Sequence, residues 1–146
     1  MRTRINQNKE QIFCEWRHKW VRLTPEEWVR QQLLHRLVEQ LGYPTSLIAV
    51  EVAFQLPSLQ GGDGGRRLRA DAVVYNADLQ PLMLIECKAE TVPLTQKTLD
   101  QALIYNRRLE VPFLLLHNGP QSIVAAITPT GCEFSTVIPS FNQLLG

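Results

Sequence analysis

The 146-residue sequence lacks the cysteine patterns of secreted and zinc-binding proteins. Its three cysteines, Cys14, Cys87 and Cys132, are widely spaced and include no CxxC pair. A scattered, odd-numbered set of this kind indicates neither a disulfide framework nor a zinc site. It is the cysteine usage expected of a protein in the reducing cytoplasm.

The sequence also has no long apolar run and no strong excess of one charge. No run approaches the roughly 20 apolar residues of a membrane-spanning helix, so we expect no membrane contact. The polar, basic first residues predict that a signal peptide is absent. A net charge of +1 indicates no class of partner. No Gly-Lys-Ser or Gly-Lys-Thr follows the glycine-rich segment 61–65, which excludes a nucleotide-binding P-loop.

What is present predicts one α/β domain with a single core, because the chain has one domain's length. The strongest helix signals lie at residues 24–41. Thr24 is a suitable N-cap, Glu27 stands where it would complete a capping box, and Gly42 is a suitable terminator. Further helices are predicted at 95–109 and 140–145, and strands at 47–56, 67–75, 82–88, 111–117, 122–127 and 131–138.

The predicted order from residue 24 is α-β-β-β-α-β, followed by the last two strands and the short helix. A strand, a helix and a strand in succession imply a parallel pair, so we expect a mixed central sheet flanked by helices. Residues 24–146 then form the domain. Residues 1–23 are predicted to be an N-terminal arm or short helix, with Phe13, Trp16 and Trp20 on one side.

Polar residues on two predicted strands are the candidates for a site. Glu86 and Lys88 are two positions apart, so in a strand both point to one face while Cys87 points to the other. A carboxylate and an ammonium at the end of an apolar strand are costly to bury. Asp71 supplies a further acid on the preceding strand.

Basic residues gather in two places, the net basic segment 1–30 and the cluster formed by Arg66, Arg67 and Arg69. Either cluster could bind phosphate groups or be an ordinary solvated surface.

These residues resemble the PD-(D/E)xK nuclease superfamily, with Asp71, then Glu86-Cys87-Lys88, then Gln101 and Tyr105 on the next helix. Taken together, several ordered segments resemble more narrowly the N-terminal domain of type I restriction enzyme R subunits. They are Leu23 to Gln31, Gly42-Tyr43-Pro44, Arg69-Ala70-Asp71, Ile85 to Lys88, Gln101 to Asn106, and His117-Asn118-Gly119. Ala70 stands where the superfamily has a proline.

The resemblance implies a restriction-endonuclease-like fold and a nuclease that cleaves DNA with Mg²⁺, for which Mn²⁺ would substitute. Asp71, Glu86, the carbonyl of Cys87 and Glu27 would hold the metal ion. Lys88 would act on the attacking water and Gln101 would hydrogen-bond in the site. Glu51 is a reserve acid. The residues expected to contact nucleic acid are Arg30, Arg66, Arg67, Arg69 and Tyr105.

Two alternatives remain open. Glu27 could serve only as a capping residue. The chain could also be a catalytically silent nucleic-acid-binding or interaction subunit of a larger restriction or repair assembly. R subunits carry a DNA-translocating motor, and this sequence has no Walker motif, so a protein partner would supply the motor or the specificity. A homodimer, with two sites for two strands, is also compatible with the sequence.

Overall fold

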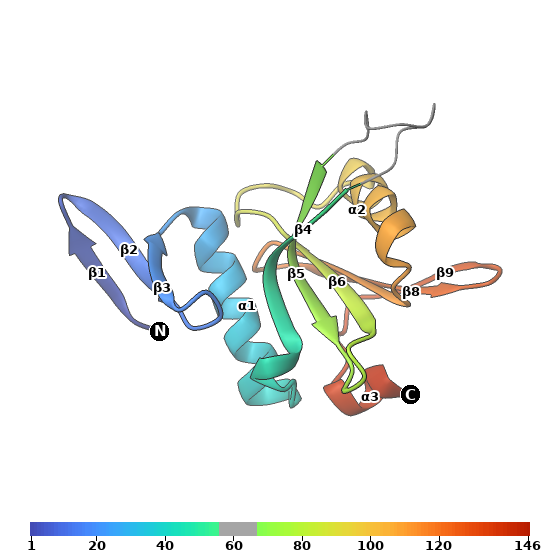
Figure 1. The fold of residues 1–146 in the computed structure, drawn as a ribbon. Coiled ribbons are helices and arrows are strands. Elements are labelled where there is room, and N and C mark those ends of the chain that lie inside the picture. Colours follow the sequence, from blue (N-terminus) through green and yellow to red (C-terminus); the bar gives the residue numbers. More distant parts are fainter. Residues whose placement is uncertain (56–66) are drawn as a thin grey trace.

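The fold is built on a six-stranded mixed sheet (Figure 1). A computed structural model describes residues 1–55 and 67–146. The strands lie in the order β4-β5-β6-β7-β8-β9, and among the described residues only β6 and β7 pair in parallel. They are β4 (Ile48–Gln55), β5 (Arg67–Tyr75), β6 (Pro81–Cys87), β7 (Phe113–His117), β8 (Ser122–Thr128) and β9 (Gly131–Ser135).

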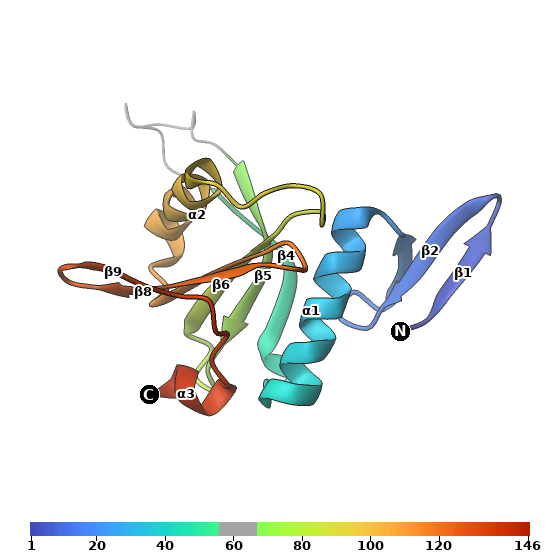
Figure 2. The same ribbon diagram turned by 180° about the vertical axis from the view of Figure 1, so that it is seen from behind.

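Helices cover both faces of this sheet (Figures 1 and 2). Helices α1 (Pro25–Leu41) and α3 (Phe141–Leu145) pack on one face, and α2 (Gln96–Leu109) packs on the other. A single 3-10 turn, η1 (Thr45–Leu47), connects α1 to β4. The order α1-β4-β5-β6-α2-β7 confirms the predicted α-β-β-β-α-β core and its mixed sheet.

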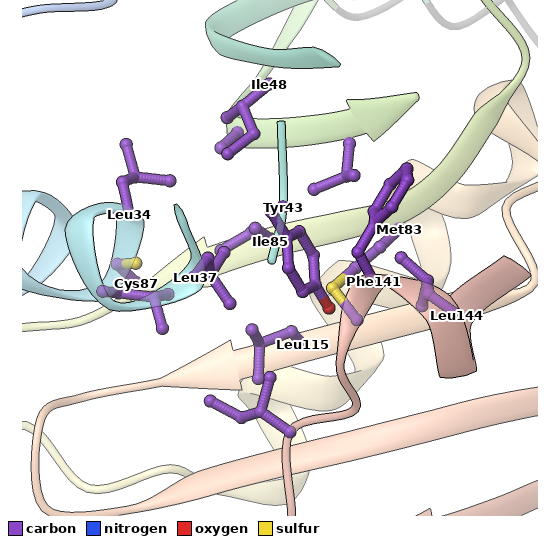
Figure 3. Close-up of a cluster of buried hydrophobic side chains, with 14 of the residues drawn as sticks. Leu34, Leu37, Tyr43, Ile48, Met83, Ile85, Cys87, Leu115, Phe141 and Leu144 are labelled. Carbon is purple, nitrogen blue, oxygen red and sulfur yellow. The ribbon is translucent and has the colours of Figure 1, made fainter. Parts of the chain in front are cut away.

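The larger apolar cluster lies between the sheet and helices α1 and α3 (Figure 3). Leu34 and Leu37 of α1 are fully buried there, and each contributes about 2 kcal/mol through burial of its side chain. The Tyr43 hydroxyl donates a hydrogen bond to the carbonyl of Pro139 at 2.9 Å, which ties the end of α1 to the segment before α3. This packing fixes α1 against the strands that carry the candidate site residues.

Helix α1 has the boundaries that its sequence predicts. The Thr24 hydroxyl accepts a hydrogen bond from the Glu27 N–H at 3.0 Å, and Gly42 adopts a left-handed conformation with φ 76°. Only this half of the predicted capping box forms, because the Glu27 carboxylate bonds to arginines instead. The helix therefore begins on a threonine cap and presents Glu27 to the protein interior.

Residues 1–23 differ from the expected arm or short helix. They form a three-stranded antiparallel sheet of β1 (Thr3–Asn6), β2 (Lys9–Cys14) and β3 (Lys19–Arg22). The aromatic residues that suggested a helix instead pair across strands, since Phe13 lies opposite Trp20 with ring centroids 5.5 Å apart. Cross-strand aromatic pairs of this kind stabilise antiparallel sheets.

Some predictions fall on residues 56–66, which lie outside the described residues. They are the end of the first predicted strand, the glycine-rich turn and Arg66. Within the described residues, no helix is both long enough and apolar enough to cross a membrane.

Candidate functional site

The candidate site forms where strands β5 and β6 part. Their backbone pairing ends at Ala72 and Ile85, so Asp71 and Glu86 come next on adjoining strands. Beyond this point the Asp71 side chain takes the place of a backbone acceptor of β5. Its Oδ2 accepts a hydrogen bond from the Cys87 N–H of β6 at 2.7 Å. The sheet thus holds Asp71 beside Glu86.

Glu86 is buried, with 9% of its surface exposed, and its Oε1 has no hydrogen-bond partner among the described residues. Burial raises the pKa of the Glu86 carboxyl, and the neighbouring charge of Asp71 raises it further. An unpaired buried carboxylate oxygen is costly unless the group is protonated or a cation approaches it. Glu86 is therefore the acceptor in this site that still lacks a partner.

The two residues after Glu86 differ in burial. The Cys87 side chain is fully buried in the larger apolar cluster, and burial raises the pKa of its thiol. Lys88 is half-buried, and its backbone N–H bonds to the carbonyl of His117 at 2.9 Å. The charge of Lys88 partly offsets the rise in the pKa of Glu86. Lys88 is thus a cation whose charge acts on Glu86.

Glu27 belongs to a different cluster, in which arginines surround its carboxylate. Its Oε1 accepts hydrogen bonds from Arg17 Nη2 and Arg30 Nη2, both at 2.6 Å. Its Oε2 accepts from Arg30 Nε and Gln31 Nε2, both at 3.1 Å. Although burial opposes ionisation, these donors together lower the pKa of Glu27 to about 2. The contacts count against the predicted role of Glu27 as a metal ligand, because its two oxygens accept four hydrogen bonds and two arginine cations already surround it.

Arg30 connects this cluster to the site. Its Nη1 donates to Asp71 Oδ1 at 3.2 Å, while its Nη2 also lies 3.3 Å from Glu51 Oε1. Glu51, the reserve acid, lies on β4 with a left-handed φ of 55° and accepts from Arg17 Nη1 at 3.0 Å. A left-handed conformation costs a non-glycine residue about 1–2 kcal/mol, and such residues are often found at functional sites. Arg30 is therefore an internal counter-ion, and its burial counts against the predicted contact with nucleic acid.

The remaining predicted residues lie outside this cluster. Gln101 is exposed on α2 and, among the described residues, forms no hydrogen bond with Asp71, Glu86 or Lys88. Tyr105 is half-buried against the smaller apolar cluster beneath α2. Arg67 and Arg69 are exposed on β5, and Arg69 Nη1 lies 4.0 Å from Glu51 Oε2.

The structure adds two residues that the sequence did not indicate. Glu26 stands in the first turn of α1, where partial burial and then the charge of Asp71 raise the pKa of its carboxyl, while Lys88 lowers it. The charges of Asp71 and Lys88 therefore act on Glu26. Arg17 reaches Glu27 and Glu51 from the loop between β2 and β3. The sequence singled out Glu27 by its position three residues after the Thr24 cap and gave no such signal for Glu26 or Arg17.

The oxygen atoms available in this site suit one hard cation that takes only a few of its ligands from the protein. Within residues 1–55 and 67–146, no group of three His, Cys, Asp or Glu side chains is arranged to hold a metal ion. Mg²⁺, however, is commonly bound through one or two carboxylates, waters and substrate phosphates. Asp71, Glu86 and the carbonyl of Cys87 provide such a partial set, and the unpaired Glu86 Oε1 is the observation that fits a cation.

The solved structures that match the chain include a restriction-enzyme fragment and a protein–DNA complex. A fragment assigned as an HsdR subunit of a type I restriction enzyme from Vibrio vulnificus YJ016 matches with a TM-score of 0.61 and 19% sequence identity. The match covers 84% of this chain and 25% of that one, so this chain spans about a quarter of its length and the likeness shows the fold alone. The DrdV–DNA complex matches with a TM-score of 0.40 and 16% identity, covering 72% of this chain and 9% of that one. This second likeness is too weak to carry an argument.

Sequence comparison gives the family. Among proteins with curated descriptions, none matches the chain. The family model of the type I restriction enzyme R protein N terminus (HSDR_N) matches residues 25–139, which contain the central sheet and Asp71, Glu86 and Lys88. The chain therefore belongs to the family of type I restriction enzyme R protein N termini.

Proposed function

We propose that the chain is a divalent-metal-dependent endonuclease of the PD-(D/E)xK type that hydrolyses phosphodiester bonds in DNA. The observation that carries the proposal is the pair of carboxylates, Asp71 and Glu86, at the point where β5 and β6 part. One of them is buried with an unpaired oxygen, and Lys88 stands two residues further along the chain. Family membership and the fold support the same reading.

Each residue has a role that follows from its chemistry. Asp71, Glu86 and the carbonyl of Cys87 would hold Mg²⁺, with Mn²⁺ as a substitute. A bound cation supplies a Lewis acid for the phosphoryl oxygens and lowers the pKa of a coordinated water. Lys88 orients or deprotonates the attacking water, or offsets negative charge in the transition state. Arg30 orients Asp71 through the contact at 3.2 Å.

The partners follow from the family and the size of the chain. The DNA substrate would run over the site, with exposed Arg67 and Arg69 available to phosphates. The chain spans about a quarter of the HsdR fragment that it resembles. We therefore propose that a type I restriction assembly provides the motor and the sequence specificity. A homodimer with two such sites would cut both strands of a duplex.

A cleavage assay tests the proposal directly. Single-stranded, duplex and branched DNA are incubated with the protein in Mg²⁺ or Mn²⁺, with EDTA as the metal-free control. We expect metal-dependent cleavage that Lys88→Ala and Glu86→Gln abolish, while Lys97→Ala on the exposed surface of α2 retains it. Cleavage that persists in Glu86→Gln would refute the assigned site.

A second candidate is a catalytically silent nucleic-acid-binding or interaction subunit. The observation in its favour is that both oxygens of Asp71 already accept hydrogen bonds, from Arg30 and from the Cys87 N–H. An intact, folded protein that binds DNA but cleaves none of the three substrates with either metal would favour this function.

A further inference from the structure

The outer face of the N-terminal sheet carries an unusual set of side chains. Opposite residues of an antiparallel pair share a face, and the pairing places Arg4, Gln11 and Arg22 in one row across the three strands. Phe13 and Trp20 form the neighbouring row. The N–H of Phe13 bonds to the carbonyl of Arg2 at 2.9 Å, which puts Arg2 beside this row. Lys9 shares the face with Arg4 and Gln11, because it pairs with Asn6.

This face is basic and contains no acid. Arg2, Arg4, Lys9 and Arg22 are exposed, and within the described part of the chain none of them forms an ion pair with a carboxylate. The acid of β2, Glu10, alternates to the opposite face together with Ile12 and Cys14. Four unpaired cations on one small sheet produce a positive potential that attracts a polyanion.

The aromatic residues hold two of these cations in position. The Arg2 guanidinium lies 4.1 Å from the centroid of the Phe13 ring, and the Arg4 guanidinium lies 4.2 Å from that of Trp20. The Nε of Arg4 also donates to Gln11 Oε1 at 2.8 Å. A stacked guanidinium is fixed in orientation while its remaining N–H groups stay free to bind the paired oxygens of a phosphate.

The position of the sheet also separates it from the candidate site. Strands β1 and β2 project beyond α1, on the side away from the six-stranded sheet (Figures 1 and 2). The match to the family begins only at residue 25, so this sheet lies outside it. The family fold therefore does not account for the basic outer face.

We propose that the outer face of β1–β3 binds the phosphate backbone of DNA without regard to base sequence, as a second contact apart from the candidate site. The proposal rests on the proposed function only in that DNA is the polyanion present there. DNA fits better than a protein partner, because the face carries four exposed cations and no acid, and neutralisation of phosphates by such cations dominates the affinity of proteins for DNA.

The test measures binding of labelled duplex DNA by fluorescence anisotropy in EDTA, so that cleavage plays no part. Two duplexes of equal length and unrelated sequence are titrated over a series of salt concentrations. The variant Arg2→Gln/Arg4→Gln is compared with Lys97→Gln/Arg107→Gln, which removes two exposed cations from α2. The binding constant K falls as salt rises, and each lost phosphate contact makes the slope of log K against log salt shallower by about 0.9. We expect the slope of Arg2→Gln/Arg4→Gln to be shallower by about 2 on both duplexes, and that of Lys97→Gln/Arg107→Gln to change little.

Two further variants separate charge from position. Arg2→Lys/Arg4→Lys keeps the charge, so most of the slope should remain while affinity falls because the lysines stack less well. Trp20→Leu keeps all cations but releases Arg4, and we expect weaker binding with an unchanged melting profile of the core. An unchanged slope in Arg2→Gln/Arg4→Gln, or equal losses in the α2 variant, would overturn the proposal. So would a failure of the wild type to bind DNA.

The outcome is independent of catalysis. A loss of slope in Arg2→Gln/Arg4→Gln would support the surface even if Glu86→Gln left cleavage unchanged and so refuted the active site. Conversely, an unchanged slope together with metal-dependent cleavage would refute DNA binding by this face and leave the proposed nuclease site intact.

Discussion

Replacing Glu27 by glutamine tests the ion-pair cluster that joins α1 to the loop of the N-terminal sheet and to β4. The substitution keeps the size of the side chain and removes its charge. It leaves Arg17 and Arg30 without the carboxylate that both contact at 2.6 Å. Because the Glu27 side chain is only 6% exposed, water cannot replace that carboxylate.

The expected loss follows from the pKa of Glu27. The cluster lowers that pKa from 4.5 to about 2. Each unit corresponds to about 1.4 kcal/mol, so the charged form stabilises the fold by about 3 kcal/mol at neutral pH. We therefore expect Glu27→Gln to lower the free energy of unfolding by about 3 kcal/mol at pH 7. A loss of this size is a large part of the 5–15 kcal/mol typical of a domain.

The same argument predicts how the loss depends on pH. A carboxyl whose pKa is lowered in the folded state contributes stability that is complete above the unfolded pKa and disappears as pH falls through the folded value. The difference between wild type and Glu27→Gln should therefore be constant above about pH 6 and shrink to less than half by about pH 3.

Urea denaturation followed by circular dichroism at several pH values provides the measurement. Glu39→Gln is the matched control on the same helix, because the Glu39 side chain is 71% exposed and lies 3.7 Å from His35 in a surface pair. We expect it to change the free energy of unfolding by less than about 0.5 kcal/mol. A loss in Glu27→Gln below about 1 kcal/mol, or an equal loss at pH 3 and pH 7, would refute the reasoning.

Three further predictions concern single residues. Burial and Asp71 raise the pKa of Glu86 from 4.5 to about 9, so as pH rises above about 4.5 the unfolded chain loses this proton first and the metal-free fold loses stability. Glu86→Gln does not titrate and should melt higher than wild type at pH 8 in EDTA; a lower melting temperature would contradict this. Burial, followed by the charge of Arg36, lowers the pKa of His117 to about 4. The free energy of unfolding of the wild type should therefore fall by about 3 kcal/mol as pH falls from about 6.5 to 4. Denaturation of His117→Gln should not show this loss of stability. The added Cβ of Gly42→Ala has no atom within 4 Å, but alanine is strained at φ 76°. We expect the substitution to lower the free energy of unfolding in urea by about 1 kcal/mol, and no measurable change would contradict the left-handed cap.

The central part of the fold could be predicted because its signals are local. Thr24, Pro25 and Gly42 define the ends of α1, and alternation along residues 67–75 defines β5. The spacing of Glu86, Cys87 and Lys88 also predicted that Cys87 would be buried away from Glu86. These elements depend on backbone preferences and on periods that can be read within a few residues.

The N-terminal sheet could not be recognised from the same signals. Phe13 and Trp20 are seven residues apart, a spacing that suits two turns of a helix as well as a cross-strand pair. The signal that would have distinguished them is the turn at Gln7 and Asn8, which both adopt positive φ, at 51° and 64°. Two such residues between strands are typical of a tight hairpin, and asparagine favours that conformation.

The arginine cluster could not be predicted, because its partners are distant in sequence. Arg17 and Glu51 are 34 residues apart, and Arg30 and Asp71 are 41 apart. Only the Glu27–Arg30 pair is local, three residues apart on α1, and nothing local indicates that Arg17 also binds Glu27. The packing of α1 on the sheet brings these residues together and buries Glu27, which is 5% exposed.

The two site carboxylates differ in their contacts. Asp71 has a cation on Oδ1 and a backbone donor on Oδ2. Glu86 has an unpaired oxygen and an ionised neighbour, which favour its neutral form. A buried acid whose pKa is raised beside a second carboxylate is typical of catalytic sites. Cation binding through Glu86 would release its proton, so under the proposed function metal affinity should increase with pH. The positive charge of Arg30 thus balances one carboxylate, and a bound divalent cation would balance the other.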